Sequence, residues 1–537
     1  MITFEADTMR IIFERSFDLQ SYDLFLRCKR LPEFNLNYDY ERDRYTISAP
    51  ARFAAVIGVE SSQTAAGALA MPDFLFEHQR EILRLALDAK RFAVWSDCGT
   101  GKTLIELEYA RQVAHITGGR ILIITLNEIV EQTLEESSRF YGDSLTIHHI
   151  HSRAEMRRWC RDGPGQIAIT NYEKMNPDDE GQIVNELRYL AGLVLDESSR
   201  LKAGGGKQKW ALIKSSRGIP YKLSATATPA PNDVIEFASQ ASFLERMRNE
   251  NEIIWTFFAR DPDTQEWTVK RHARKAFFEW MCAWSIYLRD PRRYGWSTDM
   301  ELPPEPEILR HEISPTNAQL DAQRAWNVTN EGQIALFGDK SQGIVGRSKL
   351  SQIAKGFVYE KAKPRRIESA KPDAVARLIA DERAAGLQVL VWTVFDEESE
   401  IIAERLREIS FDDFDVLSGS VSKPKRQPIL DRFRRGELSV LISKASLLGY
   451  GMNFQNCGSM IFSGWNDSFE SFYQAIRRAV RYGQKRAVRI HLPFIPELEG
   501  AMLDNIFRKE AHFEQSIKEQ EESYIAAMRR LQILEVA

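Results

Sequence analysis

The chain has 537 residues, of which 43% are hydrophobic and 28% charged, which is enough for roughly three or four globular domains. Its formal charge of -4 supplies no overall positive field for a polyanion, so any surface for nucleic acid must be local. The five cysteines are scattered, without CxxC spacing or nearby histidine pairs, and indicate neither disulfides nor zinc. No basic, apolar leader opens the sequence and no run has membrane-spanning length, so we expect a cytoplasmic protein without a membrane partner.

Residues 1–70 predict a small α+β accessory domain. Apolar runs at 9–13, 45–48 and 53–59 are typical of strands, and residues 18–29 are typical of a helix. Such a domain could bind nucleic acid or could serve only as structural support, and the sequence leaves both alternatives open.

Residues 96–103, SDCGTGKT, follow an apolar strand and open a helical pattern, which is the order that a phosphate-binding loop requires. Glycines would turn backbone N–H groups toward the phosphates, Lys102 would reach the terminal phosphates, and Thr103 would ligate magnesium. We therefore expect a nucleoside triphosphate and magnesium as cofactors, although a glycine turn before an ordinary helix is the alternative. The predicted binding residues of the loop are Ser96, Asp97, Cys98, Gly99, Thr100, Gly101, Lys102 and Thr103.

The first position of this loop holds Ser96, where the commonest form of the motif has glycine. A small residue other than glycine is usual at this position in helicase-like ATPases. Ser96 therefore favours that class among the proteins that have a phosphate-binding loop.

Two regions alternate apolar strands with helical patterns, at about 71–240 and 372–495, and predict two parallel sheets covered by helices. Only the first region has a phosphate loop. We expect two lobes with the nucleotide between them, so that closure couples hydrolysis to movement.

Asp196 and Glu197 end an apolar strand of the first region. There Asp196 would hold the metal and Glu197 would orient or deprotonate the attacking water. On a surface turn the same pair would merely be solvated. The segment 224–226, Ser-Ala-Thr, would lie behind this pair and link it to the second lobe.

Taken together, these segments resemble the Swi/Snf-type branch of the superfamily-two helicase-like ATPases. The order and spacing of that family run from about Phe74 to Gln484 in FEHQREIL, SDCGTGKT, ITNYE, LDESS, LSATATP, LLGYGMNFQ and QAIRRAVRYGQ. The resemblance implies an α/β fold class, with two RecA-like parallel-sheet lobes, a small N-terminal α+β domain, a helical insertion and a C-terminal helix. The expected domains are 1–70, 71–240, 241–371, 372–495 and 496–537.

The family's roles carry over to matching residues. Gln79 would pair with the adenine edge, and Gly451 and Asn453 would touch the nucleotide from the second lobe. Arg478 and Arg481, three apart on an expected helix, would act as arginine fingers beside the catalytic Lys102 and Glu197. A solvated basic helix face is the alternative for the two arginines. Arg477 stands where the family has glycine, which leaves the local turn open.

The resemblance also implies that short polar segments of the protein contact the phosphate backbone of the nucleic acid along which it moves. Hydroxyl, amide and N–H contacts of this kind fix register without reading bases, so we expect little sequence preference. Ordinary polar residues at strand ends would look the same. The predicted contacts are Thr125, Thr170, Asn171, Ser443 and Lys444.

The segment from about Ser242 to Pro304 is rich in tryptophan and predicts an insertion with its own small core. Phe277, Met281, Trp284 and Leu288 fall at helical spacing, which favours core packing over base stacking.

An eleven-residue repeat marks the tail, in which Met502, Phe513 and Tyr524 form one series and Ile506, Ile517 and Met528 a second. This repeat favours a brace helix laid back across the lobes over a coiled coil.

We expect an ATP hydrolase that moves along double-stranded DNA as a translocase or remodelling motor, and we expect a monomer. One alternative is a strand-separating DNA or RNA helicase, or the motor subunit of a restriction system. A separate nuclease or methyltransferase partner would then be needed, since the sequence shows no constellation for either activity. Another alternative is an ATP-gated nucleic-acid-binding adaptor, which the LDESS variant of the metal motif leaves open.

Overall fold

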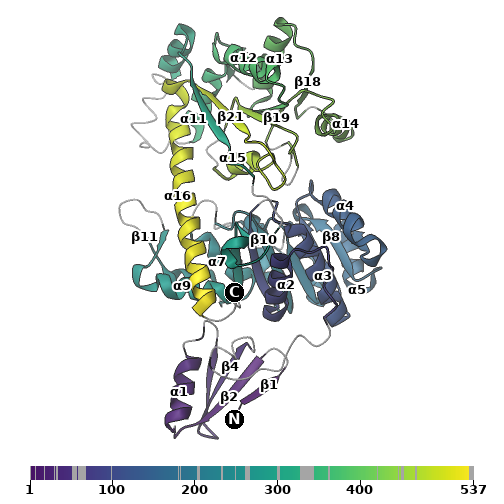
Figure 1. Ribbon diagram of the computed structural model, residues 1–537, viewed down its shortest axis with the longest axis vertical. Coiled ribbons are helices and arrows are strands. Elements are labelled where there is room, and N and C mark those ends of the chain that lie inside the picture. The colour runs from purple at the N-terminus through teal and green to yellow at the C-terminus, as the bar shows by residue number, and fades with distance from the viewer. Residues whose placement is uncertain are drawn as a thin grey trace. The chain divides into compact units, whose positions relative to one another are not determined.

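The computed structural model (Figure 1) divides the chain into two compact units, Met1–Asp299 with Gln515–Ala537, and Met300–Glu514. The residues that the structure describes are 2–5, 8–16, 18–29, 31, 34–50, 57, 68–97, 99–179, 181, 183–201, 206–230, 234–247, 249–260, 267–298, 303–326, 344–360, 363–419, 421–445, 447–448, 453–465 and 469–530.

The N-terminal region is a four-stranded antiparallel sheet of order β1-β2-β4-β3 with one helix. Met9, Ile11 and Phe13 are buried on one face, where the Phe13 ring lies 5.3 Å from that of Phe25. The elements β2, β4 and α1 match the predicted strands and helix, whereas β1 and β3 were not predicted. The strand predicted at 53–59 lies outside the described residues apart from Ile57. The elements are β1 (Ile2–Glu5), β2 (Thr8–Glu14), α1 (Leu19–Cys28), β3 (Asn35–Asp39) and β4 (Arg44–Pro50).

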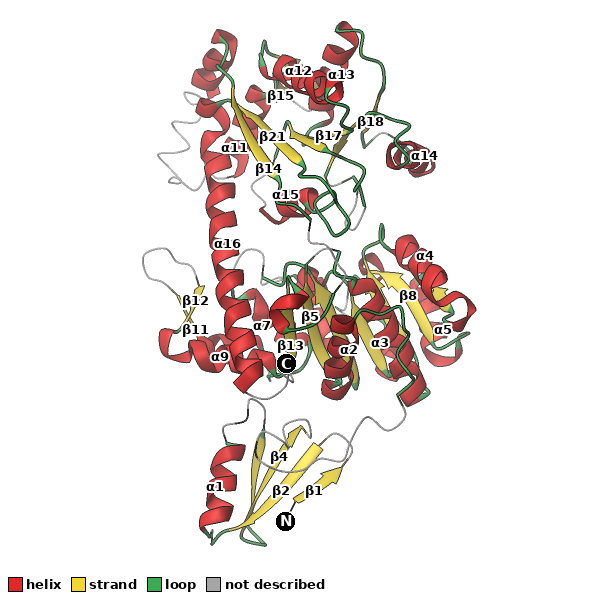
Figure 2. Ribbon diagram, in the orientation of Figure 1, coloured by secondary structure: helices red, strands yellow, loops and turns green. Residues whose placement is uncertain are grey.

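The first large sheet has seven parallel strands in the order β13-β5-β10-β9-β6-β8-β7. Its central strands are continuous apolar runs because helices cover both faces of a parallel sheet, and α3 packs on β10, β9 and β6 (Figure 2). The strands are β5 (Arg91–Ser96), β6 (Ile121–Thr125), β7 (Ile147–His149), β8 (Ile167–Asn171), β9 (Gly192–Leu195), β10 (Tyr221–Thr226) and β13 (Ser285–Leu288). The helices are α2 (Glu77–Ala89), α3 (Lys102–Thr117), α4 (Val130–Tyr141), α5 (Arg153–Asp162), α6 (Lys207–Ser215) and α7 (Glu236–Phe243).

The tryptophan-rich segment is buried as predicted, but in the part that the structure describes it does not form a core of its own. Phe277, Met281, Trp284 and Leu288 are all buried, although the helix that we expected to carry them ends at Cys282 and Leu288 lies on β13, a strand of the first sheet. The Trp284 ring lies 5.6 Å from that of Trp95 on β5, so these side chains join the core of the first sheet. Trp255 is the exception, with 80% of its surface exposed. The elements are α8 (Glu250–Phe257), β11 (Phe258–Arg260), β12 (Trp267–Val269) and α9 (Arg274–Cys282).

The second large sheet has six parallel strands in the order β14-β21-β20-β17-β19-β18. Its core includes Val375, Ile379, Val391 and Ile442, which α12 and α13 help to cover. The strands are β14 (Glu307–Glu312), β17 (Val389–Thr393), β18 (Phe414–Leu417), β19 (Val440–Lys444), β20 (Ser459–Phe462) and β21 (Arg489–Phe494). The remaining elements are α11 (Ile344–Ala354), β15 (Phe357–Glu360), β16 (Lys363–Arg366), α12 (Lys371–Ala384), α13 (Asp396–Glu408), α14 (Lys423–Arg434) and α15 (Phe469–Ile476).

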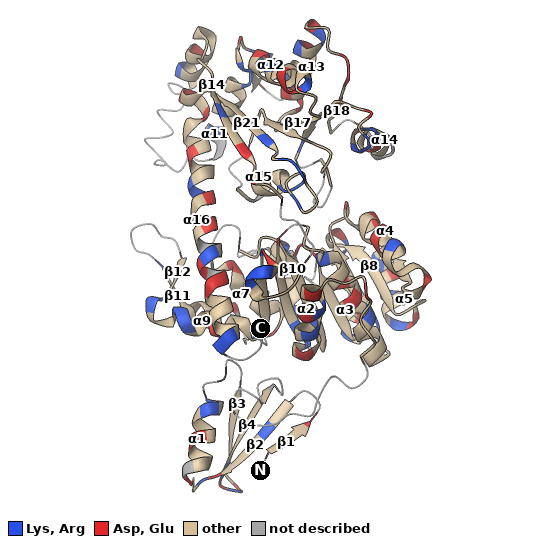
Figure 3. Cartoon of the chain, in the orientation of Figure 1, with Lys and Arg blue, Asp and Glu red and all other residues tan. Residues whose placement is uncertain are grey.

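The chain ends in a long helix, α16 (Pro496–Arg530), on which basic and acidic residues interleave (Figure 3). Its buried stripe contains every described side chain of the eleven-residue repeat, namely Met502, Ile506, Ile517, Tyr524 and Met528. In the first unit the Tyr524 hydroxyl hydrogen-bonds Ser285 and the Glu521 carboxylate pairs with Arg293. Within the part of the chain that the structure describes, no helix is both long and apolar enough to cross a membrane.

Candidate ATP site

The phosphate loop connects β5 to α3 and depends on two glycines. Gly99 and Gly101 have φ angles of 86° and 80°, in the left-handed region that glycine adopts without a steric penalty. A Cβ atom at Gly101 would lie 2.1 Å from Nε2 of Gln79, so no larger residue fits without displacing that amide. Cys98 lies outside the described residues.

Polar contacts hold the side chains of the loop in place. Lys102 Nζ donates to the carbonyl oxygens of Ser96 at 2.6 Å and Asp97 at 3.1 Å. The Thr100 hydroxyl donates to the Asp97 carbonyl at 2.7 Å, and the Ser96 and Thr100 hydroxyls hydrogen-bond each other. Ser96, which stands where the commonest form of the motif has glycine, therefore stabilises the loop by a hydrogen bond to another of its side chains.

Asp196 follows β9 and is held as a carboxylate acceptor. The Thr125 hydroxyl donates to its Oδ2 at 2.7 Å, the backbone N–H of Glu197 donates to its Oδ1 at 2.8 Å, and the Tyr172 hydroxyl donates to its carbonyl oxygen at 2.8 Å. Burial raises the pKa of Asp196, while the Thr125 hydrogen bond and the Lys102 charge oppose that rise. The carboxylate is fixed before any ligand binds.

Glu197 has a strained backbone, with φ of 49°, a left-handed conformation that costs a non-glycine residue about 1–2 kcal/mol. The Thr226 hydroxyl donates to its Oε2 at 3.2 Å, which ties the Ser-Ala-Thr segment to the acid as expected. Strain of this kind at a carboxylate beside a phosphate loop is typical of a functional residue.

Glu106 is a member of the site that the sequence analysis missed. It lies on α3 one turn after Lys102, is 2% exposed, and has its pKa raised well above the ordinary range by burial and by the charges of Asp196 and Glu197. Residues four apart on a helix share a face, so its distance from Lys102 was a signal that could have revealed it. Glu106 thus interacts electrostatically with Asp196, Glu197 and Lys102 at this site.

His78 was also missed. It is fully buried, its Nε2 lies 3.2 Å from the Thr100 carbonyl oxygen, and burial lowers its pKa. The ring therefore supports the phosphate loop from behind.

The Gln79 amide lies against the same loop and is 1% exposed. Its Nε2 donates to the carbonyl oxygens of Thr100 at 3.4 Å and Gly101 at 3.3 Å, and its Oε1 accepts from the Phe76 N–H at 2.9 Å. Pairing with adenine would require these bonds to be exchanged, and that role stays a prediction.

The donor set fits magnesium that arrives with a nucleotide. Oxygen ligands from Asp196 and Thr103 suit a hard cation, which usually binds through one or two carboxylates and substrate phosphates. Among the described residues, no group of three or more His, Cys, Asp or Glu side chains is arranged to hold a metal ion.

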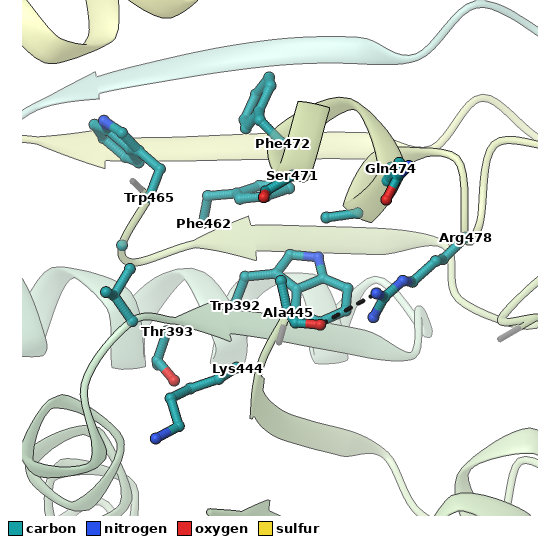
Figure 4. Close-up of a pocket in the computed structure, with 13 residues that line it drawn as sticks. Trp392, Thr393, Lys444, Ala445, Phe462, Trp465, Ser471, Phe472, Gln474 and Arg478 are labelled. Carbon is teal, nitrogen blue, oxygen red and sulfur yellow. Dashed lines mark hydrogen bonds between the residues drawn. The ribbon is translucent and has the colours of Figure 1, made fainter. Parts of the chain in front are cut away.

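In the second lobe, Arg478 is 5% exposed and lies inside the lobe itself (Figure 4). Its Nη2 donates to the Ala445 carbonyl oxygen at 3.2 Å, and its guanidinium lies 5.0 Å from the centre of the Trp392 ring. The helix that we expected to carry both arginines ends at Ile476, so the prediction that Arg478 and Arg481 share a helix face is wrong. The chain turns instead toward Gly483, whose φ is 88°.

Asn453 is exposed, with its side-chain amide 3.2 Å from Oε1 of Gln455 and its Oδ1 accepting from the Gln455 N–H at 3.1 Å. Gly451 lies outside the described residues. The contacts that we predicted for both with nucleotide stay predictions.

The predicted nucleic-acid contacts are mostly turned inward. Thr125, Thr170 and Ser443 are fully buried, and their hydroxyls donate to Asp196, to the Ile150 carbonyl and to the Leu417 carbonyl. Asn171 is 6% exposed, and Lys444 pairs with Asp396 at 2.7 Å while keeping 17% of its side chain exposed. Nucleic-acid binding at these five positions stays a prediction.

Two family descriptions match the two lobes. Residues 74–231 match the Type III restriction enzyme, res subunit, and residues 370–483 match the Helicase conserved C-terminal domain. The chain is 29% identical over 418 residues to a Bacillus subtilis protein named as an ATP-dependent helicase/translocase, YwqA, covering 74% of this chain and 43% of that protein. It is 23% identical over 455 residues to the nuclear protein STH1/NPS1 of Saccharomyces cerevisiae, covering 77% of this chain and 32% of that protein. The chain is a superfamily-two helicase-like ATPase of the Swi/Snf type.

This Swi/Snf-type ATPase is also 23% identical over 439 residues to protein p41 of Acyrthosiphon pisum secondary endosymbiont phage 1, covering 77% of the chain and 91% of that protein. A structure titled Sulfolobus solfataricus SWI2/SNF2 ATPase core in complex with dsDNA is 19% identical, covers 88% of this chain and 99% of that one, and has a TM-score of 0.38. The chain spans less than half the length of YwqA and STH1/NPS1. The family assignment and the two-lobed α/β fold are as predicted, and the protein is an ATP hydrolase of the helicase and translocase type.

Proposed function

We propose that this ATPase is a motor that translocates along double-stranded DNA and displaces or remodels what is bound there, without needing to separate the strands. The observation that carries the proposal is the hydrolytic set of Lys102, Asp196 and Glu197 at one edge of the first sheet, in a chain of the Swi/Snf type. The relative named as a helicase/translocase supports the same activity.

The chain's own residues divide the work of hydrolysis. Lys102 exchanges its two carbonyl acceptors for the terminal phosphates of ATP, Thr103 and Asp196 hold magnesium, and Glu197 orients the attacking water. Magnesium held by Thr103 and Asp196 would neutralise the charge that develops on the phosphate oxygens. The guanidinium groups of Arg478 and Arg481 stabilise the same developing charge. Gln79 recognises the adenine ring. The protein acts as a monomer.

Hydrolysis by the purified chain tests this proposal. ATP turnover is measured with no nucleic acid, duplex DNA, single-stranded DNA and RNA, with Lys102→Ala as the blank. Duplex DNA alone should stimulate turnover, and the chain should then displace a third strand from a DNA triplex. Preference for single strands or RNA would indicate a strand-separating helicase, and a low rate that no track changes would indicate an ATP-gated adaptor.

A second candidate is the motor subunit of a restriction system, which the match of residues 74–231 to the res subunit favours. A separate nuclease or methyltransferase would supply cutting or modification. Copurification of the tagged chain from its native cell should recover such a partner, and loss of ATP-dependent DNA cleavage in Lys102→Ala would support this candidate.

A further inference from the structure

A pocket of about 220 Å³ lies at the carboxyl end of the second sheet, within the unit Met300–Glu514 (Figure 4). Its walls come from residues at the ends of β17, β19 and β20, and α15 covers it. The chain leaves β17 toward β18 on one side of the sheet and leaves β20 toward β21 on the other. In open parallel sheets, the crevice at such a reversal of strand direction is where ligands bind.

Four aromatic rings line the pocket. Trp392, Phe462, Trp465 and Phe472 are each at most 5% exposed, and Figure 4 shows them arranged around the pocket. The indole nitrogens of Trp392 and Trp465 are buried and, among the described residues, have no hydrogen-bond partner. Flat rings with unpaired donors suit a planar ligand that carries acceptor atoms.

Gln474 is one of the polar side chains that line the pocket, together with Thr393, Lys444, Ser471 and Arg478. It is 8% exposed, and within the described part of the chain neither its Oε1 nor its Nε2 has a hydrogen-bond partner. A buried amide with both atoms unpaired is costly, and buried polar groups are normally satisfied. An amide offers one donor beside one acceptor, which is the pattern that the edge of a nucleobase complements.

We propose that this pocket binds a single nucleobase, with its ring among the aromatic side chains, its polar edge on the Gln474 amide and its phosphate toward Lys444. The volume lies below the ~300–1,000 Å³ of pockets that bury drug-sized ligands, which suits one ring system. A free nucleotide and a nucleotide turned out of a nucleic-acid strand present the same chemistry. All the residues that line the pocket belong to the unit Met300–Glu514, and binding there does not require DNA translocation.

Fluorescence of 2-aminopurine tests the site in the full-length Lys102→Ala chain, so that ATP turnover plays no part. One titration uses 2-aminopurine riboside monophosphate, and a second uses a DNA duplex with one 2-aminopurine opposite an abasic site. Stacking on the indoles should quench either probe saturably. Gln474→Leu should weaken binding about tenfold or more, while Gln112→Leu, which alters a fully buried amide of the first lobe that bonds Leu69, should leave it unchanged.

Quenching of the monophosphate alone identifies a free nucleotide as the ligand, and quenching of the duplex alone identifies a turned-out base. The absence of saturable quenching with both probes, or equal affinity in Gln474→Leu, overturns the proposal. Should Gln474→Leu fail to fold, photolabelling of the Lys102→Ala chain with 8-azidoadenosine monophosphate tests whether the pocket binds the base. Label within residues 462–478 supports the site, and label confined to first-lobe peptides refutes it.

Discussion

The two large sheets share an architecture but differ in chemistry at their carboxyl ends. In the first sheet, Lys102 and Asp196 are tied down by hydrogen bonds from neighbouring backbone and side chains. In the second sheet, Trp392 and Gln474 line a pocket in which, among the described groups, the indole nitrogen and both amide atoms have no partner. The fold thus determines where a ligand can lie, and the side chains determine which ligand that is.

The difference extends to charge. Three carboxyl groups and one ammonium group gather at the first site, which suits a metal and phosphates, whereas four aromatic rings line the second beside the cations Lys444 and Arg478. A site of fixed, opposed charges is prepared for a reaction in which charge develops, and a ring-lined site with unpaired polar atoms is prepared for binding.

The largest effect should come from breaking the first site at its strained acid. Glu197→Gln keeps size and hydrogen bonding but removes the base, so the hydrolysis rate should fall by up to about 10⁴-fold while ATP binding remains. Steady-state turnover and nucleotide titration measure the two quantities. Glu128→Gln, an exposed neutral substitution in the same lobe, is the matched control. Turnover within about tenfold of the wild type would contradict the role.

Arg478 tests whether the second lobe also serves the reaction. As an arginine finger it should contribute about 10³-fold, so Arg478→Ala should reduce turnover by that factor with little change in ATP affinity. Arg477→Ala removes the neighbouring cation, which lies 4.9 Å from the centre of the Tyr473 ring, and should change turnover little. If both variants behave alike, the guanidinium of Arg478 serves only the packing against Trp392.

A buried ion cluster offers a way to weaken the second unit alone. Glu499 bonds Lys355 at 2.8 Å and Lys371 at 2.5 Å, and all three are 1% exposed. Glu499→Gln leaves two buried ammonium groups facing a neutral amide, which should cost about 3–5 kcal/mol of unfolding free energy. Denaturant unfolding measures the loss, and Glu497→Gln, exposed two residues away, is the control. Equal stability of the two variants would show that the cluster relaxes without cost.

The sequence predicted the first site better than the second for physical reasons. The phosphate loop is a local motif whose glycines and lysine act through nearby backbone, so spacing alone identifies it. The apolar strands predicted within 71–240 and 372–495 are present, as β5, β6, β8, β9 and β10 in the first sheet and β17, β18, β19, β20 and β21 in the second, because buried parallel strands are continuous apolar runs. The missed strands β7, β13 and β14 are edge strands, and β14 is largely exposed, with the sequence EILRHE.

The pocket of the second sheet could not have been predicted, because it depends on segments that are distant in sequence. In the sequence Trp392 looks like an ordinary core residue and Gln474 is the first residue of the QAIRRAVRYGQ segment, and the two come together only in the folded sheet. Burial of Thr125 and Ser443 was equally hidden, since a hydroxyl at a strand end points inward or outward according to a register that only the folded sheet defines.

The smallest effect concerns pH and compares the two units directly. Each has a buried lysine, Lys222 in the first and Lys371 in the second, and burial lowers the pKa of each from 10.5 to about 8. Between these values the unfolded chain binds the proton that the folded chain has lost, so stability rises as the pH increases from about 8 to about 10. Lys371→Met should flatten that rise for the second unit and Lys222→Met for the first, as measured by thermal unfolding at several pH values. If neither substitution changes how stability depends on pH, then Lys222 and Lys371 both titrate at their ordinary pKa because the surrounding structure opens locally to water. The two units would then differ only in the chemistry at the carboxyl ends of their sheets.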